Sequence, residues 1–434
     1  MALTIGIVGL GYVGLTLTAA LARAGHTVHG VDSQPAVLDT LARGRPHIFE
    51  PGVGEVFAEL VGRRIFVGPA LPTVPLDAVV ISVSTPIDPV SRRPELGNLA
   101  AAARDIARCC PEGTPVVVRS TVPVGTTRRV VLPVLQERWD RVRLAMAPER
   151  TIQGQALREL VELPQVVGGI DAESTAVVAR VFGELARRVV PVSNPEAAEL
   201  VKLANNCHTD LIYAYGNEIA LIADQHGLDP LEVIRAANLD YPRPDLAKPG
   251  FVGGGCLSKD PFLMLDSAPD NPPFLVGRAR ELNEYLPVHV AETVVRLLRQ
   301  GGGTRLSVLG WAYKGWPPTD DMRGSPVTPM MPVFAAAGIT VRGHDPMVTD
   351  EVIRRHGGEP VDLAKAFRDA DGVLLLNDHP NYRAMNVADL VGDCSVDARP
   401  LFVYDSWRIL DEAAVTAAGV RYVGLGYRPD GEPR

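Results

Sequence analysis

A glycine pattern near the amino terminus constrains the fold more than any other feature of this sequence. The apolar run Thr4–Val8 is followed by Gly9-Leu-Gly11-Tyr-Val-Gly14 and then by a stretch rich in alanine and leucine that continues to Ala24. The order strand, glycine turn, helix is typical of the dinucleotide-binding units of doubly wound sheets. There the glycines permit a tight turn and let the backbone approach a pyrophosphate. The sequence therefore predicts an α/β fold with a parallel sheet.

A carboxylate at the end of the second expected strand identifies the dinucleotide. The run Thr27–Val31 ends at Asp32. A carboxylate at this spacing holds the ribose hydroxyls of NAD and repels the additional phosphate of NADP. The pattern therefore predicts NAD as the cofactor, and a purely structural glycine turn is the alternative.

Three further apolar runs end in polar residues. Leu76–Val83 leads to Thr85, Val116–Ser120 leads to Thr121, and a third run leads to Glu149. Ligands of a doubly wound sheet lie beyond the carboxyl ends of its strands, so we expect these side chains near a ligand. Taken singly, each threonine could equally cap a helix or a turn.

The middle of the chain changes its pattern to one long helix. Apolar residues recur at helical spacing from Glu196 to Gly227, as in helices that bridge domains or pack against a partner. Lys202 and Asn206 are four residues apart and share a face, so an ammonium and an amide could both point at one oxygen. As an exposed surface pair the two residues would have no function.

A cysteine follows three consecutive glycines in Gly250-Phe-Val-Gly-Gly-Gly-Cys256-Leu-Ser-Lys-Asp260. Glycines allow the backbone to approach a ligand closely. If residues 257–260 open a helix, Cys256 lies near its N-terminus, where a thiolate is favoured, and Asp260 lies about one turn away on the same face. The segment therefore predicts a nucleophile with a polar assistant, and a buried structural cysteine is the alternative.

The last part of the chain repeats the logic of the first. After the linker Gly301–Gly303, the run Arg305–Leu309 is followed by Gly310, and a second run ends at Asp345. We expect the α/β class, with two Rossmann-like doubly wound parallel-sheet domains, residues 1–195 and 301–434, joined by a central long-helix domain, residues 196–300. The carboxyl-terminal part lacks a full G-x-G-x-x-G, which favours a nucleotide diphosphate over a second dinucleotide.

Composition excludes several classes of partner. The 434 residues carry a formal charge of −8, which disfavours nucleic acid or an anionic membrane. No apolar run reaches the roughly 20 residues that a membrane span needs. The five cysteines are odd in number and irregularly spaced, which indicates neither a disulfide framework nor a metal site. We expect an untargeted cytoplasmic enzyme.

Seven motifs in chain order carry a resemblance to a known family, the UDP-glucose/UDP-N-acetylmannosamine/GDP-mannose dehydrogenases. The motifs are Gly9-x-Gly11-Tyr-Val-Gly14, Ser82-Val-Ser-Thr-Pro86, Ser120-Thr-Val-Pro-Val-Gly125, Pro148-Glu-Arg150, Lys202-Leu-x-x-Asn206, Gly253-Gly-x-Cys-x-x-Lys-Asp260 and Asp321-x-Arg-x-Ser-Pro326. The resemblance runs nearly from end to end. It implies oxidation of the C6 alcohol of a nucleotide sugar to a carboxylate with two NAD per turnover, in a homodimer built on the central helix.

The resemblance also implies which residues act. A thiolate can trap the intermediate aldehyde as a thiohemiacetal, which a second oxidation converts to a thioester. The implied catalytic residues are Cys256, Lys202, Asn206, Asp260, Glu149 and Thr121. Glu149, Asp260 and a water bound to Thr121 all remain candidates for the hydrolysis of the thioester.

Two further sets of residues are implied to bind ligands. The cofactor set is Gly9, Gly11, Tyr12, Val13, Gly14, Asp32, Thr85 and Thr121. The substrate set is Glu149, Arg150, Lys202, Asn206, Arg243, Gly253, Lys314 and Arg323, in which Arg243 resembles an arginine that crosses the dimer interface. No metal is implied.

The segment Pro148–Gly154 resembles the acetamido-sugar branch of the family, which favours UDP-N-acetylmannosamine or UDP-N-acetylglucosamine over UDP-glucose or GDP-mannose. The segments 315–319 and 404–408 depart from the family pattern, which leaves the nucleotide base open. Two other classes also remain open. One is a two-electron dehydrogenase of the hydroxyacid type, with Lys202 as its acid and Cys256 incidental, and the other is an NAD-binding scaffold without turnover.

Overall fold

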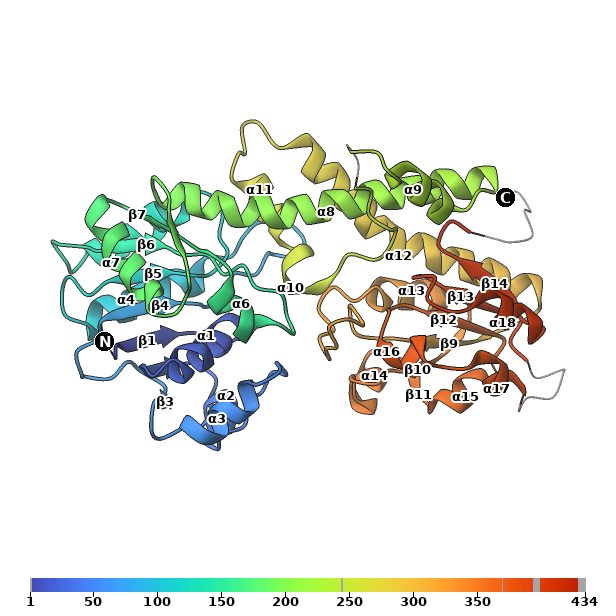
Figure 1. Cartoon of the computed structure of the whole chain (residues 1–434), viewed down its shortest axis with the longest axis horizontal. Helices are drawn as coiled ribbons and strands as arrows, with labels where there is room; N and C mark the ends of the chain where they lie inside the picture. Colours follow the sequence, from blue (N-terminus) through green and yellow to red (C-terminus); the bar gives the residue numbers. More distant parts are fainter. Residues whose placement is uncertain (1, 243–244, 369, 393–398, 428–434) are drawn as a thin grey trace. The chain divides into compact units, whose positions relative to one another are not determined.

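A computed structural model describes residues 2–242, 245–368, 370–392 and 399–427 of the chain. It divides into two compact units. The amino-terminal unit comprises Met1–Asn206 and Phe262–Pro273, and the carboxyl-terminal unit comprises Cys207–Pro261 and Phe274–Arg434. Each unit contains one sheet covered by helices (Figure 1). The expected pair of α/β sheets with a central helical region is confirmed.

The amino-terminal unit is built on an eight-stranded sheet in the order β3-β2-β1-β4-β5-β6-β7-β8. Its first six strands are parallel and have the order typical of dinucleotide-binding folds. The strands are β1 (Thr4–Val8), β2 (Thr27–Val31), β3 (Ile65–Gly68), β4 (Ala78–Ile81), β5 (Val116–Val118), β6 (Leu144–Met146), β7 (Gln165–Gly169) and β8 (Val189–Pro191).

One strand pair departs from the expected parallel sheet. β7 runs antiparallel to β6, with Ala145 opposite Gly169, and β8 is parallel to β7. An antiparallel neighbour begins at the edge where the preceding strand ends, so the connecting chain does not have to return to the opposite edge. The segment between β6 and β7, which carries Glu149 and Arg150, can therefore stay at the carboxyl edge where ligands bind.

Alternation along the strands builds an apolar core on each face of this sheet. In β4, Ala78 and Val80 join one cluster of buried side chains, and Val79 and Ile81 join the other, because successive residues point to opposite faces. The helices of the unit are α1 (Tyr12–Arg23), α2 (Pro35–Ala42), α3 (Val53–Leu60), α4 (Gly97–Cys109), the π-helical turn η1 (Thr127–Val131), α5 (Leu132–Gln136), α6 (Ala156–Glu162) and α7 (Ala172–Gly183).

The predicted long helix is present as α8 (Pro195–His226). The division between the two units falls within it, between Asn206 and Cys207. Lys202 and Asn206 therefore belong to the amino-terminal unit, and the last two-thirds of the helix belong to the carboxyl-terminal unit.

The carboxyl-terminal unit repeats the strand order of the first six strands in an all-parallel sheet, β11-β10-β9-β12-β13-β14. Its strands are β9 (Arg305–Leu309), β10 (Thr340–His344), β11 (Glu359–Pro360), β12 (Gly372–Leu375), β13 (Phe402–Asp405) and β14 (Arg421–Gly424). The helices after α8 are α9 (Pro230–Asn238), α10 (Gly254–Leu257), α11 (Asp260–Asp266), α12 (Phe274–Gln300), α13 (Val327–Ala336), α14 (Asp350–Arg355), α15 (Leu363–Phe367), α16 (Pro380–Arg383), α17 (Val387–Gly392) and α18 (Glu412–Ala417).

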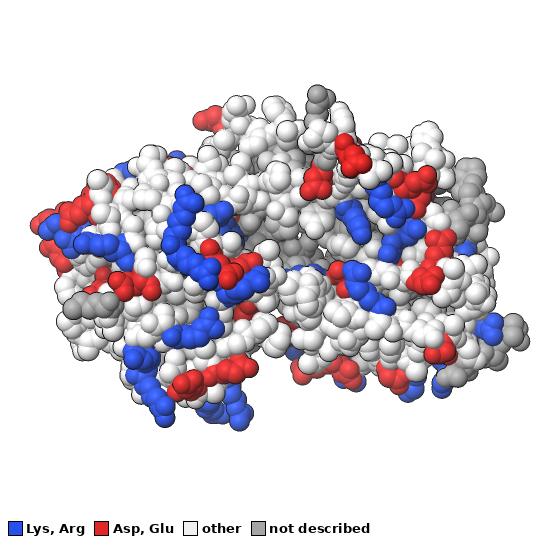
Figure 2. All heavy atoms as spheres, in the orientation of Figure 1, with Lys and Arg blue, Asp and Glu red and all other residues white. Residues whose placement is uncertain are grey.

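Two features of the structure concern the charged surface and the apolar character of the helices. On the face shown in Figure 2, basic and acidic side chains are interspersed. Within the described part of the chain, no helix is both long enough and apolar enough to span a membrane.

Candidate active site

The glycine turn after β1 leaves its backbone open to a ligand. Gly9 has a φ of 94°, which glycine adopts readily, and its N–H donates to Val31 O at 2.8 Å. A side chain at Gly14 would collide with Gly9 O, whereas a Cβ on Gly11 would meet nothing within 4 Å. α1 begins at Tyr12 and has no side-chain cap, so its first N–H groups remain available to an anion. These residues fit the pyrophosphate of NAD.

Asp32 lies beside this turn. Its Oδ2 accepts a hydrogen bond from Leu10 N at 2.9 Å, and its Oδ1 accepts one from Gln34 N at 2.9 Å. The carboxylate is half-buried and binds the backbone of the turn. It lies where the ribose of a dinucleotide is bound in folds of this kind.

The two predicted threonines meet at the ends of adjacent strands. The buried Thr85 hydroxyl donates to Thr121 O at 2.7 Å, which joins the segments after β4 and β5. The structure therefore brings Thr85 and Thr121 together. The Thr85 hydroxyl is used in this hydrogen bond within the protein.

Glu149 and Lys202, predicted separately, form a buried ion pair. Lys202 Nζ lies 3.6 Å from Glu149 Oε2, and the two side chains are only 6% and 8% exposed. Burial disfavours the carboxylate, but Lys202, the hydrogen bond from Thr151 and the charge of Arg119 outweigh burial and lower the pKa of Glu149. Glu149 is therefore ionised at neutral pH, and in this arrangement it is the counter-ion of Lys202 and a weak base.

The charge of Arg119 helps to keep Glu149 ionised, and this residue was not predicted from the sequence. Arg119 Nη1 donates to Ala147 O at 3.0 Å, and Nη2 donates to Gln165 Oε1 at 3.2 Å. The side chain is buried, which lowers the pKa of Arg119 to about 10, although the charge of Glu149 acts in the opposite direction. An arginine that directly follows the buried strand Val116–Val118 was the available signal, since arginine is almost never fully buried without partners.

Glu199 is a second missed residue, and it fixes the position of α8. Its carboxylate accepts hydrogen bonds from Thr127 N at 2.7 Å and from Gly125 N, and the residue is fully buried. Burial raises the pKa of Glu199 despite these contacts. Glu199 is one helical turn before Lys202, so the same contacts place Lys202 at the edge of the sheet.

Glu50 is a third missed residue, and it connects Tyr12 to the segment after β6. It accepts hydrogen bonds from Tyr12 Oη at 2.8 Å, Gly154 N at 2.7 Å and Ala156 N at 2.8 Å. Burial and Glu50 raise the pKa of Tyr12 above its ordinary value. The predicted cofactor residue Tyr12 thus has its hydroxyl bound within the protein.

Arg150 is hydrogen-bonded to Asn205, the residue next to the predicted Asn206. Arg150 Nε donates to Asn205 Oδ1 at 3.1 Å, and Asn206 is half-buried one turn beyond Lys202. Lys202 and Asn206 share a helix face as predicted.

The cysteine segment forms two short helices, and the expected single helix is wrong. α10 begins at Gly254 and ends at Leu257, and Asp260 begins α11. The Ser258 hydroxyl donates to Gly254 O at 2.7 Å, where such a bond competes with continuation of the helix. Cys256 and Asp260 therefore do not lie one turn apart on the same helix. Cys256 is exposed, so the alternative of a buried structural cysteine is also wrong.

The three glycines bring this segment against its own unit. A Cβ on Gly253 would collide with Gly324 O, one on Gly254 would lie 2.8 Å from the Tyr313 ring, and one on Gly255 would lie 2.7 Å from the Arg323 guanidinium. Gly254 N also donates to Arg323 O at 2.9 Å. Side chains at these positions would push Cys256 away from Arg323.

Arg323 is oriented by Asp321, with Nε at 3.0 Å from Oδ1 and Nη2 at 2.6 Å from Oδ2. These hydrogen bonds, and to a smaller extent the nearby Cys256, raise the pKa of Arg323. A cation beside a thiol favours the nucleophilic thiolate form.

Asp260 is fully buried and pairs with Lys259 Nζ at 2.6 Å. Burial, Asp260 and Asp210 together raise the pKa of the neighbouring Cys207 thiol to about 12. Among the described residues of this unit, Cys207 is thus a buried thiol beside carboxylates and Cys256 is an exposed thiol beside an arginine.

Two predicted substrate residues complete the set. Lys314 is half-buried, with Nζ 5.5 Å from the centre of the Tyr313 ring. Arg243 lies outside the described residues.

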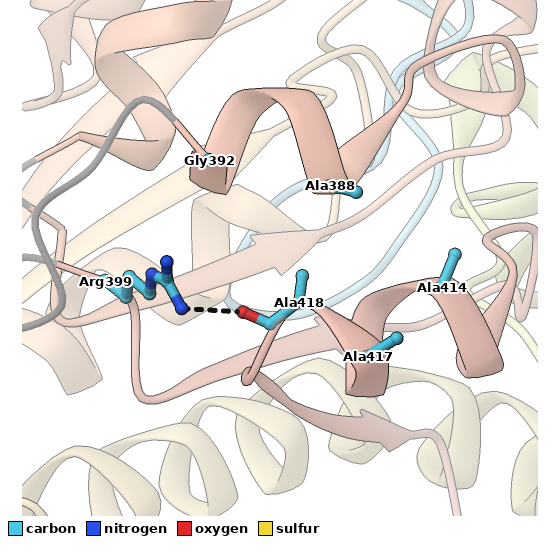
Figure 3. A pocket seen from close by; sticks show the side chains of 6 residues that line it. All are labelled: Ala388, Gly392, Arg399, Ala414, Ala417 and Ala418. Carbon is cyan, nitrogen blue, oxygen red and sulfur yellow. Dashed lines mark hydrogen bonds between the residues drawn. The ribbon is translucent and has the colours of Figure 1, made fainter.

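A pocket between α17 and α18 contains none of the predicted residues (Figure 3). It is lined by alanines and Arg399, whose Nη1 donates to Ala418 O at 3.3 Å. Across the described ranges, no group of three or more histidine, cysteine, aspartate or glutamate side chains could hold a metal ion.

Protein-family models match three consecutive parts of the chain. Residues 3–186 match the NAD binding domain of the UDP-glucose/GDP-mannose dehydrogenase family. Residues 196–285 match the central domain of this family, and residues 307–412 match its UDP binding domain.

Individual proteins agree with these matches. The chain is 32% identical to an NDP-N-acetyl-D-galactosaminuronic acid dehydrogenase of Ralstonia nicotianae, over 92% of this chain and 96% of the relative. It is 31% identical to the UDP-N-acetyl-D-mannosamine dehydrogenase of Pyrococcus horikoshii, over 97% and 99%. A solved structure of UDP-D-ManNAc dehydrogenase from Pyrococcus horikoshii matches with a TM-score of 0.87 and 30% identity, covering 98% of this chain and 99% of that one. Together with the open NAD turn, these similarities show that the chain belongs to the UDP-glucose/GDP-mannose dehydrogenase family and is an NAD-dependent nucleotide-sugar dehydrogenase.

Proposed function

We propose that the substrate is a UDP-linked acetamido sugar, of the N-acetylmannosamine or N-acetylglucosamine type, oxidised at C6 to the uronic acid. The relatives at 31% and 32% identity are named for acetamido sugars, and the segment Pro148–Gly154 resembles the same branch. UDP-glucose and GDP-mannose are the competing substrates. The proposal divides the chain into cofactor-binding residues 1–195, catalytic and dimer-forming residues 196–300, and sugar-nucleotide-binding residues 301–434.

NAD, when bound, accepts the hydride that C6 loses in each of the two oxidations. Gly11 would leave room for the pyrophosphate, and Gly9 and Gly14 would permit the tight turn that presents it. Val13 would lie beside the pyrophosphate in the first turn of α1, and Asp32 would hold the adenosine ribose. Tyr12, Thr85 and Thr121 would shape the rest of this site.

Lys202 and Asn206 would stabilise negative charge on the C6 oxygen as it develops. The ammonium of Lys202 is already desolvated, so its interaction with an oxyanion is stronger than it would be in water. Glu149 keeps this ammonium in place. Because the pKa of Glu149 is lowered, this carboxylate is a weak general base. Glu149, Asp260 and a water held by Thr121 all remain candidates for the hydrolysis step.

Cys256 would carry the sugar between the oxidations. Its thiolate adds to the aldehyde carbon and forms a C–S bond, and the aldehyde oxygen takes up a proton to give the thiohemiacetal. Loss of a hydride from C6 and of the hydroxyl proton gives a thioester. Water then breaks the C–S bond, which releases the carboxylate and regenerates the thiolate. The observation that carries this role is an exposed thiol beside Arg323 on a segment that is otherwise packed tightly.

The sugar nucleotide would be bound by cations and by glycine backbone. Lys314 and Arg323 would bind the diphosphate, and Gly253 would allow the close approach of the backbone. Arg150 and Arg243 complete the proposed set. In an otherwise acidic protein these side chains would form a local anion site.

We further infer a homodimer through α8. Ile212, Tyr215 and Ile222 are exposed by 36%, 56% and 53%, and Ile219 between them is half-buried. Their spacing of three, four and three residues places them on one face, where an unpartnered apolar stripe favours contact between helices. A cytoplasmic location is part of the proposal, because Cys256 must remain a reduced thiol.

The stoichiometry of NADH and the mass of trapped enzyme test the proposal. Wild-type protein should form two NADH per UDP-N-acetylmannosamine or UDP-N-acetylglucosamine, whereas a two-electron dehydrogenase would form one and a scaffold none. Cys256→Ser should accumulate an acyl ester that is visible as an adduct by intact-mass spectrometry, because the serine alkoxide is a poor leaving group. Cys109→Ser, a change at another exposed thiol, should turn over normally without an adduct. Near-normal uronic acid formation by Cys256→Ala would overturn covalent catalysis, and higher kcat/KM with UDP-glucose or GDP-mannose would overturn the substrate.

A further inference from the structure

The segment 250–257, which contains Cys256, is held at its first residue by hydrogen bonds to one buried amide side chain. Asn217 of α8 accepts a hydrogen bond from Gly250 N at 2.7 Å and donates to Gly250 O at 3.0 Å. One side chain thus binds both polar groups of a single residue. Asn217 is fully buried. Loss of its amide would leave the N–H and the C=O of Gly250 without these hydrogen bonds in a buried position, which is unfavourable.

The same segment is fastened at its end by a buried guanidinium. Arg280 Nη1 of α12 donates to Leu257 O at 2.9 Å, and Leu257 directly follows Cys256. The same nitrogen donates to Asp210 Oδ1 of α8 at 2.8 Å. The side chains of Arg280 and Asp210 are only 4% and 1% exposed.

Asn283 joins the two fastening points. Its Nδ2 donates to Asp210 O and to Asp210 Oδ1, both at 2.9 Å, and its Oδ1 accepts from Asn217 Nδ2 at 3.0 Å. Four buried side chains on two helices therefore form a continuous chain of hydrogen bonds from Gly250 to Leu257. The exposed Cys256 lies between these two points.

A buried network of this kind is poorly explained by stability alone. Removing an arginine and an aspartate from water is expensive, and apolar side chains of similar volume commonly stabilise a core as well or better. What a connected chain of buried hydrogen bonds provides is a defined geometry, because each of its bonds requires one particular donor and one particular acceptor. Here the geometry that is specified is that of the backbone on both sides of the thiol.

We propose that Asn217 and Arg280, linked through Asn283 and Asp210, are positioning residues that hold Cys256 at the place required for attack on the sugar aldehyde. This role rests on the proposed function of Cys256. According to this proposal, four residues outside the predicted site raise kcat without changing the affinity for substrate or cofactor.

The experiment compares Asn217→Leu and Arg280→Met with the control Arg278→Met. Arg278 lies on the same helix, but its side chain is 81% exposed and pairs with the exposed Glu281. Both test variants should lower kcat at least 10-fold while KM for the sugar nucleotide and for NAD stays within 3-fold, and Arg280→Lys should recover part of kcat. Because Arg280→Met leaves Asp210 buried without its cationic partner, the double variant Asp210→Leu/Arg280→Met removes both members of the pair and provides a second test if the single variant does not fold.

A second measurement requires no substrate. Hydrogen exchange of the peptide containing residues 250–257 should become faster in the test variants than in wild type or Arg278→Met. The rate of alkylation of Cys256 by iodoacetamide should change relative to that of Cys109 in the same molecule, since Cys109 is exposed and lies in the other unit.

These measurements separate the failure of the inference from that of the proposed function. Unchanged exchange, or faster exchange with wild-type kcat, would overturn the positioning role. A parallel loss of affinity for both ligands would also overturn it. Retained activity of Cys256→Ala would instead refute covalent catalysis, whatever the exchange data show.

Discussion

The turns that follow the first strand of each sheet share three of six residues but differ in which backbone groups they leave open. Gly9-Leu-Gly-Tyr-Val-Gly14 corresponds to Gly310-Trp-Ala-Tyr-Lys-Gly315, and each first glycine donates its N–H to the last residue of the neighbouring strand. In the amino-terminal unit α1 begins inside the turn, at Tyr12. In the carboxyl-terminal unit the next helix, α13, begins only at Val327. The same turn therefore presents helix N–H groups in one unit and a loop in the other.

The aspartates beside the two turns show the same contrast. Asp32 accepts two backbone hydrogen bonds, whereas Asp345 accepts four, from Trp311 N at 2.6 Å, Ala312 N at 3.0 Å, Met347 N at 2.7 Å and Val348 N at 2.9 Å. Trp311 is fully buried against Gly343 and Gly358, and Gly11 borders open space. The backbone of the first turn thus stays open, whereas the backbone of the second turn is taken up by its own packing.

The largest effect should come from breaking the buried ion pair at the edge of the amino-terminal sheet. Lys202→Met leaves the buried carboxylate of Glu149 without its ion-pair partner, so we expect a loss of roughly 3–5 kcal/mol in the free energy of unfolding at neutral pH. The pair of Arg128 and Glu196, whose side chains are 42% and 28% exposed, is the control, because Arg128→Met should cost about 1 kcal/mol or less.

The pH dependence of this loss has a defined sign. In the wild type the pKa of Glu149 is lowered, so its contribution to stability is present above the pKa of the unfolded chain, about 4.3, and is lost as the pH falls. In Lys202→Met the charge that lowers the pKa of Glu149 most strongly is missing, so burial moves this pKa upward in the folded protein. The folded variant therefore loses stability as the pH rises through the pKa of Glu149 in the folded state. Unfolding curves for the two proteins should converge near pH 4 and diverge toward pH 8, and a gap that does not depend on pH would contradict the ion pair.

The two aspartates should differ in their effect on stability. Asp345→Ala leaves four backbone N–H groups without their acceptor and should cost about 3 kcal/mol, measured by denaturant unfolding. Asp32→Ala removes two such bonds in a site open to solvent and should cost about 1 kcal/mol. Equal losses would show that the two turns are equivalent after all.

Gly11→Val should remove cofactor binding without unfolding the protein. Gly11 has a φ of −64°, which valine can adopt, and its surroundings are open. Valine methyl groups would occupy the space of the pyrophosphate, so the Kd for NAD measured by calorimetry should rise about 100-fold, or about 2.8 kcal/mol. Gly183→Val is the control, since Gly183 also meets no neighbour within 4 Å but lies at the end of α7. Unchanged NAD affinity of Gly11→Val would place the cofactor elsewhere.

The smallest effect should be on the choice between cofactors. Asp32→Ala should weaken NAD binding about 10-fold, or about 1.4 kcal/mol, while NADP loses the repulsion of the carboxylate. The ratio of kcat/KM for NAD to that for NADP measures the change. Equal use of both cofactors by the wild type would refute the role of Asp32.

Local patterns were sufficient to predict the architecture. Strand, glycine turn and aspartate recur at Gly9 and Asp32 and again at Gly310 and Asp345, and both sheets formed as these patterns indicated. α8 also agreed with its helical spacing to within a residue at each end. Such features depend on residues that are close together in the chain, so the amino-acid sequence carries them directly.

Contacts between distant residues could not be predicted in this way. The antiparallel course of β7, the pairing of Lys202 with Glu149, and the hydrogen-bonded chain from Asn217 to Arg280 all join positions that are far apart in the sequence. A buried charged or polar side chain needs a partner, but the sequence does not say which one, because the partner is chosen by the packing of whole helices and sheets. The sequence by itself determined the two α/β sheets, the NAD turn and the position of a cysteine directly after three glycines. Only the tertiary structure decided that Glu149 is a counter-ion, that Arg119 and Glu199 support the site, and which buried groups hold the cysteine segment.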